Sequence, residues 1–174
     1  TAKAGEMASL MARLDLDLPE FRRQQALAYP IAGMMALVAM AVFSGLTKGY
    51  DDLADYAATL SQGQLRALKF RLDPHTRRVR CPKRSSFAYV LTQLDSEPLE
   101  QVLLLWQEQV LGPVQDRLVI LDGKQIRHAD VESVSAVSGS GRWLGSTLVQ
   151  EGSNEIPAAR EQLMAAHTRQ VREH

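Results

Sequence analysis

One carboxylate in the chain, Asp122, follows a short apolar run and is followed by two cations, Lys124 and Arg127. The run over residues 118–121 is typical of a buried strand, so we expect the strand to end at Asp122. A strand end is a rigid place from which to project a carboxylate. Two interpretations are open from these residues alone: an ordinary Asp-Gly turn after an edge strand, or a carboxylate placed for chemistry.

A second group of residues that could take part in binding lies in residues 66–84, called the basic island below. Its net charge is +7 in a chain whose formal net charge is zero. Such a concentration indicates an anionic partner at one face, whereas the plain alternative is a solvated loop without a partner. The basic residues, opposed by Asp73, are Arg66, Lys69, Arg71, Arg77, Arg78, Arg80, Lys83 and Arg84.

The segment after the basic island predicts a helix whose first turn could meet a phosphate. Ser85 or Ser86 is suited to cap a helix that continues to residue 94, and a helix N-terminus favours phosphate. Helix, turn and capped helix would suit a helix-turn-helix-like module that places residues 85–94 in a DNA groove. From these residues alone the solvated loop stays open as the alternative.

The first structural element to consider for positioning these residues is a long uncharged segment. Ala26–Thr47 carries no charge over 22 residues, which is long enough for a membrane crossing. It is nevertheless rich in Ala, Met and Gly, and Pro30 stands where a helix should begin. The neighbouring segments supply apolar faces to cover it, so we expect the buried central helix of a bundle and no membrane association.

The remaining segments predict a helical domain followed by an α/β unit. Residues 51–60, 62–72 and 96–111 read as helices, with Ser61 as the cap of the second and Ser96 at the start of the third, and Gly112-Pro113 ends the last of them. Three short strands then follow, over residues 117–122, 130–137 and 142–150, with a glycine turn at 139–141 between the last two, and a final helix starts at Pro157. The expected fold class is α+β, with an all-helical, helix-turn-helix-like domain at 1–113 and a partial ribonuclease-H-like α/β unit at 114–174.

The cysteine content and the N-terminal residues bear on the compartment. Cys81 is a single cysteine, so there is no disulfide framework. The N-terminal residues are polar and lack the apolar core of a signal peptide. We therefore expect a cytoplasmic protein.

Several motifs together resemble the H-repeat-associated family of insertion-sequence transposases. In the second half they are "LDGKQIRHA", "VSAVSGSGRWLGS" and "EGSNEIPAAREQL". Upstream, "YPIAGMMALVAMAVFSGLTKGYDDLADYA" and "CPKRSSFAYVLTQLD" are similar to the helical domain that precedes catalysis in that family. The similarity runs from about Asp17 onward, and its combination of motifs is more specific than any one of them.

The resemblance implies a DDE enzyme with a ribonuclease-H-like fold, in which three carboxylates hold two Mg²⁺ or Mn²⁺ ions. Asp122 would be the first of them, as catalytic residue and metal ligand, and Lys124 and Arg127 would lie near the scissile phosphate. A metal pair activates the attacking oxygen and stabilises the leaving one. Double-stranded DNA would be the partner, and a homo-oligomer is an option. The residues expected to contact DNA are Arg77, Arg78, Arg80, Lys83, Arg84, Ser85, Ser86, Lys124 and Arg127.

The tail of the chain departs from the family pattern. The family places its second aspartate at the end of a further strand, in a "DAxHTQ"-like run, whereas this chain has "LMAAHTRQ" with Met164 at that position. One carboxylate cannot hold a metal pair, so no metal ion is expected to bind tightly to this chain. Either the protein is a truncated or repurposed transposase, or segments of a longer protein after Leu163 and beyond His174 are not represented.

We therefore expect an insertion-sequence transposase polypeptide that binds DNA and, in complete form, carries out metal-dependent cleavage and strand transfer. The alternative is a non-catalytic DNA-binding or regulatory protein derived from such an enzyme. A soluble helical interaction module without nucleic acid is a third hypothesis, which explains Asp122 and the basic island poorly.

Overall fold

The computed structural model describes residues 4–22, 27–45, 47–116, 118–126, 131–149 and 155–171. The chain divides into two compact units, Thr1–Trp106 (unit 1) and Gln107–His174 (unit 2). The division falls inside a helix, a few residues before the boundary at 113 that the sequence suggested. The mixture of helices with a small sheet agrees with the expected α+β class.

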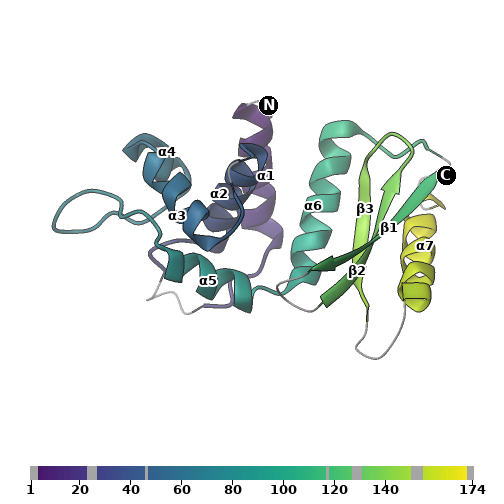
Figure 1. The fold of residues 1–174 in the computed structure, drawn as a ribbon. Helices are drawn as coiled ribbons and strands as arrows, with labels where there is room; N and C mark the ends of the chain where they lie inside the picture. The colour runs from purple at the N-terminus through teal and green to yellow at the C-terminus, as the bar shows by residue number, and fades with distance from the viewer. Residues whose placement is uncertain are drawn as a thin grey trace. The chain divides into compact units, whose positions relative to one another are not determined.

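Unit 1 is built from helices in its described residues (Figure 1). The last of them continues past the division into unit 2. The helices are α1 (Ala4–Asp17), α2 (Ile31–Phe43), α3 (Tyr50–Thr59), α4 (Gln62–Ala67), α5 (Arg84–Gln93) and α6 (Ser96–Leu111).

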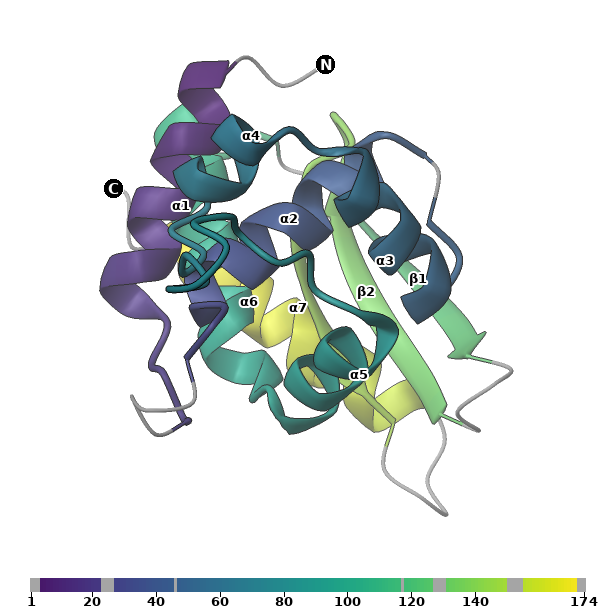
Figure 2. The same ribbon diagram turned by 90° about the vertical axis from the view of Figure 1, so that its left-hand side faces the viewer.

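The central helix of unit 1 is α2, which lies between α1 and α3 (Figure 2). It has no charged residue, and its first two turns, residues 31–37, are buried throughout. Met34 and Leu37 are completely inaccessible to solvent. At 13 residues the helix is about 20 Å long, shorter than the roughly 30 Å hydrocarbon core of a bilayer. The expected buried bundle helix is confirmed, and no helix in the described ranges has the length and apolar character to cross a membrane.

Helix α1 was not anticipated from the sequence. Leu10 and Leu14 lie one turn apart on one face and are almost fully buried, and α1 packs against α2. Met7 and Met11 lie beside them, half-buried against the same core. The spacing of these four apolar residues is that of an amphipathic helix, so the signal was present in the sequence.

The expected cap at Ser61 and the expected start of a helix at Ser96 are both confirmed. The Ser61 hydroxyl accepts a hydrogen bond from the Gln64 N–H, and the Gln64 side chain accepts one from the Ser61 N–H (2.9 Å), which completes a capping box. Ser96 is the first residue of α6. In the first turn of α6 the N–H of Glu97 donates to the Asp95 carboxylate (3.1 Å), because Asp95 stands just outside that turn, where a side chain can turn back.

Unit 2 contains, in its described residues, the end of α6, a three-stranded antiparallel sheet and one further helix. The strands are β1 (Val119–Ile126), β2 (Val131–Ser138) and β3 (Trp143–Leu148), in the order β1-β2-β3, followed by α7 (Glu155–Val171). The expected succession of three strands and a helix is confirmed. The helix starts two residues before Pro157, which lies in its first turn, where the missing proline N–H has no intrahelical role.

Helix α7 covers one face of this sheet, and Asp122 points to the other. Gln162 of α7 donates a hydrogen bond to the Thr147 hydroxyl, and Thr147 is the cross-strand partner of Val134, so both lie on the face that α7 covers. Asp122 is the cross-strand partner of Ser135, which follows Val134 in β2. Because neighbouring residues of a strand point to opposite faces, Asp122 lies on the face away from α7, where it is exposed.

The expected glycine turn between β2 and β3 is also confirmed, and a carboxylate before β1 holds it. Gly141 has φ +86, a conformation that favours glycine. The Ser140 N–H donates to the Asp116 carboxylate (3.0 Å), and hydrogen bonds from Ser140 and Ser138 lower the pKa of Asp116. Arg142 donates to the carbonyls of residues 112–113, which ties the turn to the end of α6.

Candidate nucleic-acid interface

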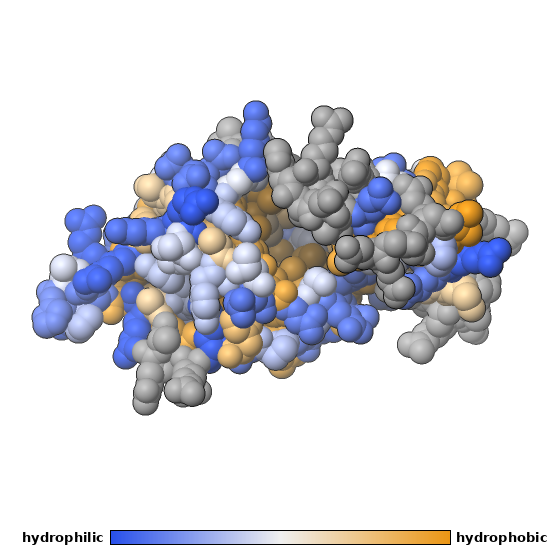
Figure 3. Space-filling model, turned by 60° about the horizontal axis from the view of Figure 1, so that its bottom comes forward, coloured by the Kyte–Doolittle hydropathy of each residue, from blue (hydrophilic) through white to orange (hydrophobic). Residues whose placement is uncertain are grey.

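The basic island runs through α4 and the following loop into α5. In the loop, Leu72 and Val79 form an antiparallel bridge, and the Asp73 N–H donates to the Arg78 carbonyl (2.9 Å). Residues 71–80 therefore form a short hairpin, called the basic hairpin below. It extends away from the helices of unit 1 (Figure 1), and its surface is mostly hydrophilic (Figure 3).

This hairpin is incompatible with the expected helix-turn-helix arrangement of α4 and α5. The two helices are joined by residues 68–83, whereas the turn of that motif has roughly 3–4 residues. The hairpin exists because Val79 is buried and exchanges hydrogen bonds with Gln62 of α4: the Val79 N–H donates to the Gln62 side chain (2.8 Å), which donates back to the Val79 carbonyl (3.1 Å). Pro74 and Pro82 are typical of a loop, and the pairing of Val79 with Gln62 is what orders it.

Asp73 organises the hairpin, a role that was not predicted from the sequence. Its carboxylate accepts hydrogen bonds from the N–H groups of His75 and Thr76, each at 2.9 Å, and it is paired with Arg80. The N–H groups of Thr76 and His75, with the Arg80 charge, hold the pKa of Asp73 below its ordinary value. An Asp-Pro pair that starts a polar turn was the available signal, because an aspartate at that position bonds to backbone N–H groups two and three residues on.

The cations of the basic island are all exposed, but they differ in their partners. Lys69 is paired with Asp15, Arg80 with Asp73, and the Arg84 Nε with Asp51 at 3.3 Å. The others form no ion pair or side-chain hydrogen bond within the described part of the chain, and their charge is therefore available to a phosphate. These five are Arg66, Arg71, Arg77, Arg78 and Lys83.

The first turn of α5 differs from the expectation. The helix starts at Arg84, its N-cap residue is Lys83, and no side chain caps it. Ser85 and Ser86 thus lie within the first turn and not before it, so the expected serine cap is wrong. The proximity of Asp51 to Arg84 also places a negative charge beside this turn, which weakens the case for a phosphate there.

One side of α5 nevertheless has the composition of a DNA-contacting surface. Ser85, Tyr89, Thr92 and Gln93 are exposed, with 56% of Tyr89 accessible to solvent. Phe87 and Val90 on the opposite side are buried in the core of unit 1. Hydroxyl and amide groups on an exposed helix can bond to phosphates and base edges.

The expected position of Asp122 at a strand end is wrong. β1 continues to Ile126, and its pairing with β2 runs without interruption from Asp122 opposite Ser135 to Ile126 opposite Val131. Because these residues keep an extended backbone, neither an Asp-Gly turn nor a strand end occurs at Asp122. The carboxylate projects from the middle of the strand. The side chain of Lys124 and the whole of Arg127 lie outside the described residues, so their expected proximity to Asp122 stays a prediction.

A three-carboxylate metal site is not assembled by the described residues. No group of three or more His, Cys, Asp or Glu side chains in these ranges could hold a metal ion. Met164, the position of the second aspartate in the family pattern, lies within α7 and is 73% exposed. The family pattern ends a strand at the position of Met164, whereas here α7 passes through Met164 and continues to Val171.

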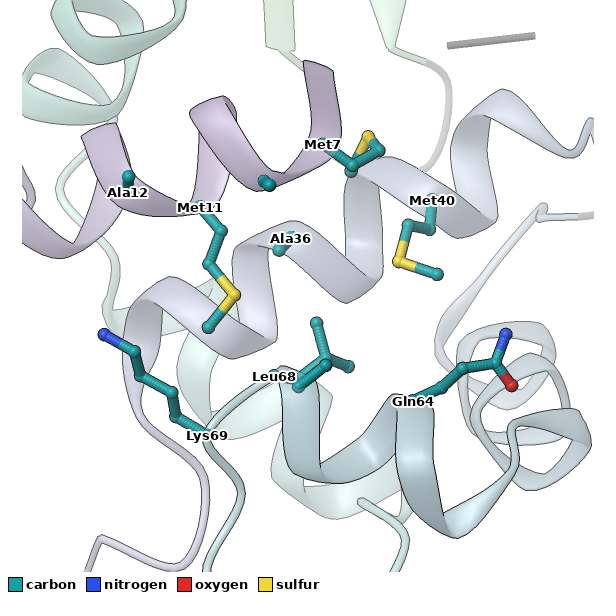
Figure 4. Close-up of a pocket in the computed structure, with 10 residues that line it drawn as sticks. Met7, Met11, Ala12, Ala36, Met40, Gln64, Leu68 and Lys69 are labelled. Atoms are coloured by element: carbon teal, nitrogen blue, oxygen red, sulfur yellow. The ribbon is translucent and has the colours of Figure 1, made fainter. Parts of the chain in front are cut away.

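Unit 1 also has an apolar hollow of about 450 Å³ between α1, α2 and α4 (Figure 4). Met7, Met11 and Met40 surround it, with Ala36 and Leu68 between them. Methionine side chains adapt to irregular gaps. Gln64 and Lys69 also line it, and Lys69 of the basic island is already paired with Asp15, so the lining is mainly apolar and offers a phosphate little to bind.

Unit 1 is therefore a helical domain with an ordered cationic hairpin. The family model described as DDE_Tnp_1-associated matches residues 16–107, nearly all of it within unit 1. The match covers more than half of the chain, and the protein belongs to the DDE_Tnp_1-associated family. It is thus a transposase-related protein. No curated protein and no solved structure matches the chain.

Proposed function

We propose that the chain is an insertion-sequence transposase polypeptide whose helical unit binds double-stranded DNA. Membership of a transposase-associated family supplies the class. The observation that supports DNA binding is the set of five exposed cations without a partner in the described residues, gathered in the basic island. Since arginine and lysine on a rigid scaffold neutralise backbone phosphates, this surface suits a duplex.

Catalysis would belong to a complete form of the enzyme. Asp122 is exposed on the face of the sheet away from α7, and a carboxylate there could serve as one ligand of an Mg²⁺ or Mn²⁺ ion. The described residues do not supply the further carboxylates that a metal pair needs. Cleavage and strand transfer are therefore proposed only for a form of the protein that provides them.

A non-catalytic DNA-binding or regulatory protein derived from a transposase is the second candidate. Its specific support is the unbroken α7, which carries Met164 where the family pattern has its second carboxylate. Such a protein would occupy DNA sites without cutting them. The two candidates make the same prediction for DNA binding and differ only in Mg²⁺-dependent nicking.

The salt dependence of DNA affinity tests the shared part of the proposal. Five phosphate contacts predict that the logarithm of affinity falls with the logarithm of salt concentration with a slope of about 4–5. Arg77 and Arg78 together should account for about 2 of this slope, measured by fluorescence anisotropy with a labelled duplex after both are changed to alanine.

The matched control removes the same charge elsewhere. Lys48 and Arg160 are exposed and lie outside the basic island. Changing both to alanine should leave the slope nearly unchanged. Equal slopes for the two double variants, or no measurable DNA binding by the folded parent, would favour a helical interaction module without nucleic acid.

A further inference from the structure

The basic hairpin borders a second hollow, which is open to solvent and has a volume of about 550 Å³. One side of it is formed by Ala28 and Tyr29, and the other by the hairpin, including the arginines at 71, 77 and 80. The volume lies within the roughly 300–1,000 Å³ range of small-ligand sites. Three guanidinium groups around one hollow indicate an anionic ligand.

The charges around the hollow do not cancel. Asp73 is the carboxylate in its lining, and it is already paired with Arg80 and bonded to two N–H groups. Arg71 and Arg77 form no ion pair or side-chain hydrogen bond in the described ranges. Two guanidinium charges are thus left for a ligand, and a guanidinium matches phosphate oxygens in a two-point arrangement.

The hairpin holds these arginines on a fixed backbone. The Arg71 N–H donates to the Ala28 carbonyl, and the Arg77 N–H donates to the Asp73 carbonyl, each at 2.9 Å. Arg77 has φ +55, a left-handed conformation that costs a side-chain-bearing residue about 1 kcal/mol. Glycine or asparagine would occupy this position without strain. The presence of arginine therefore indicates that its side chain has a role beyond forming the turn.

We propose that this hollow is a phosphate-binding subsite in which Arg71 and Arg77 bind the anion directly and Asp73 positions the hairpin. In a complex with DNA the subsite would hold one backbone phosphate, and this assignment rests on the function proposed above. The same chemistry would accept a free phosphate or the phosphate of a nucleotide. The source of the phosphate is therefore tested separately from the site.

The site itself is tested on the full chain with inorganic phosphate at constant ionic strength. We expect saturable shifts of the amide signals of residues 71–80 in NMR spectra. The double variant Arg71→Gln/Arg77→Asn should weaken phosphate binding at least tenfold. Asparagine tolerates the left-handed backbone, and unchanged amide signals of the buried core would show that the variant is folded.

Lys48→Gln/Arg160→Gln is the matched control, because both residues are exposed and lie outside the basic island and outside the lining of the hollow. This control should bind inorganic phosphate as the parent does. An equal loss of phosphate binding in the control, or an undiminished affinity in the Arg71→Gln/Arg77→Asn variant, would overturn the subsite.

Duplex DNA then identifies the source of the phosphate. If the hollow holds a DNA phosphate, the double variant should lose duplex affinity and its salt slope should fall by about 1–2. Loss of phosphate binding with unchanged duplex affinity would overturn the DNA assignment in favour of a free phosphate or nucleotide. Phosphate binding by a parent protein that does not bind DNA would refute the proposed function while supporting the subsite.

Discussion

Replacing Gly33 with alanine tests the closest contact in the core of unit 1. Gly33 lies in the first turn of α2, and a Cβ atom added there would lie 2.1 Å from the Leu68 carbonyl oxygen and 2.9 Å from Cε1 of Phe70. The Leu68 carbonyl belongs to the backbone at the end of α4, so it cannot turn aside as a flexible side chain would. Either α2 or the segment after α4 must move by about 1 Å to restore an ordinary contact.

The size of the effect follows from two opposing terms. Alanine is preferred over glycine inside a helix by about 1 kcal/mol. Overpacking of a core typically costs about 1–3 kcal/mol, and a clash with a backbone oxygen belongs at the upper end of that range or beyond it. We therefore expect Gly33→Ala to lower the free energy of unfolding of unit 1 by about 2 kcal/mol or more.

Urea denaturation followed by the fluorescence of Trp106 measures this change. Trp106 belongs to unit 1, where its indole N–H donates to the Ser9 hydroxyl (3.0 Å), and a Trp143→Phe background removes the signal of unit 2. Gly63→Ala in α4 is the control, because its Cβ would have only an ordinary 3.8 Å contact, and it should be neutral or stabilising by up to about 1 kcal/mol. A Gly33→Ala protein as stable as its parent, with the same dependence on urea, would refute the reasoning.

Three further predictions concern the hairpin, the core and the candidate catalytic residue. Hydrogen bonds lower the pKa of Asp73 in the folded protein. Its contribution to stability is therefore present above the unfolded pKa of about 3.9 and is lost as pH falls through the folded pKa. The urea midpoint of Asp73→Asn should lie below that of the parent at pH 7, and the two midpoints should converge below about pH 4. Ala36→Asp should unfold unit 1, since it buries an unpaired charge at a cost of several kcal/mol. Val38→Asp, at a half-buried site, should cost less stability. A cooperative unfolding transition of Ala36→Asp like that of the parent would contradict the assignment of α2 to the core. Asp122→Asn should change the free energy of unfolding by no more than about 0.5 kcal/mol and leave duplex affinity equal or slightly higher, and a marked loss of DNA affinity in anisotropy titrations would show that Asp122 has a different role.

The candidate interface was predictable as a composition but not as a geometry. The concentration of arginines and lysines in residues 66–84 is visible in the sequence. The ion pairs that occupy Lys69 and Arg84 involve Asp15 and Asp51, which are far away in the chain. Because their proximity arises only from the packing of helices, the sequence alone could not show which cations remain available.

For the fold, local patterns determined the elements, and long-range contacts determined their limits. The uncharged segment around α2 and the serine cap at Ser61 were enough to predict helices, since periodicity and capping depend on near neighbours. The continuation of β1 through Asp122 to Ile126 depends on hydrogen bonds with β2, and a strand is stable only where its partner is present. The conversion of a proline-containing loop into an ordered hairpin likewise depends on Val79 meeting Gln62. The sequence by itself determined which residue types the protein places in each segment, and the tertiary structure decided which of them face one another, because those contacts join residues that the chain separates.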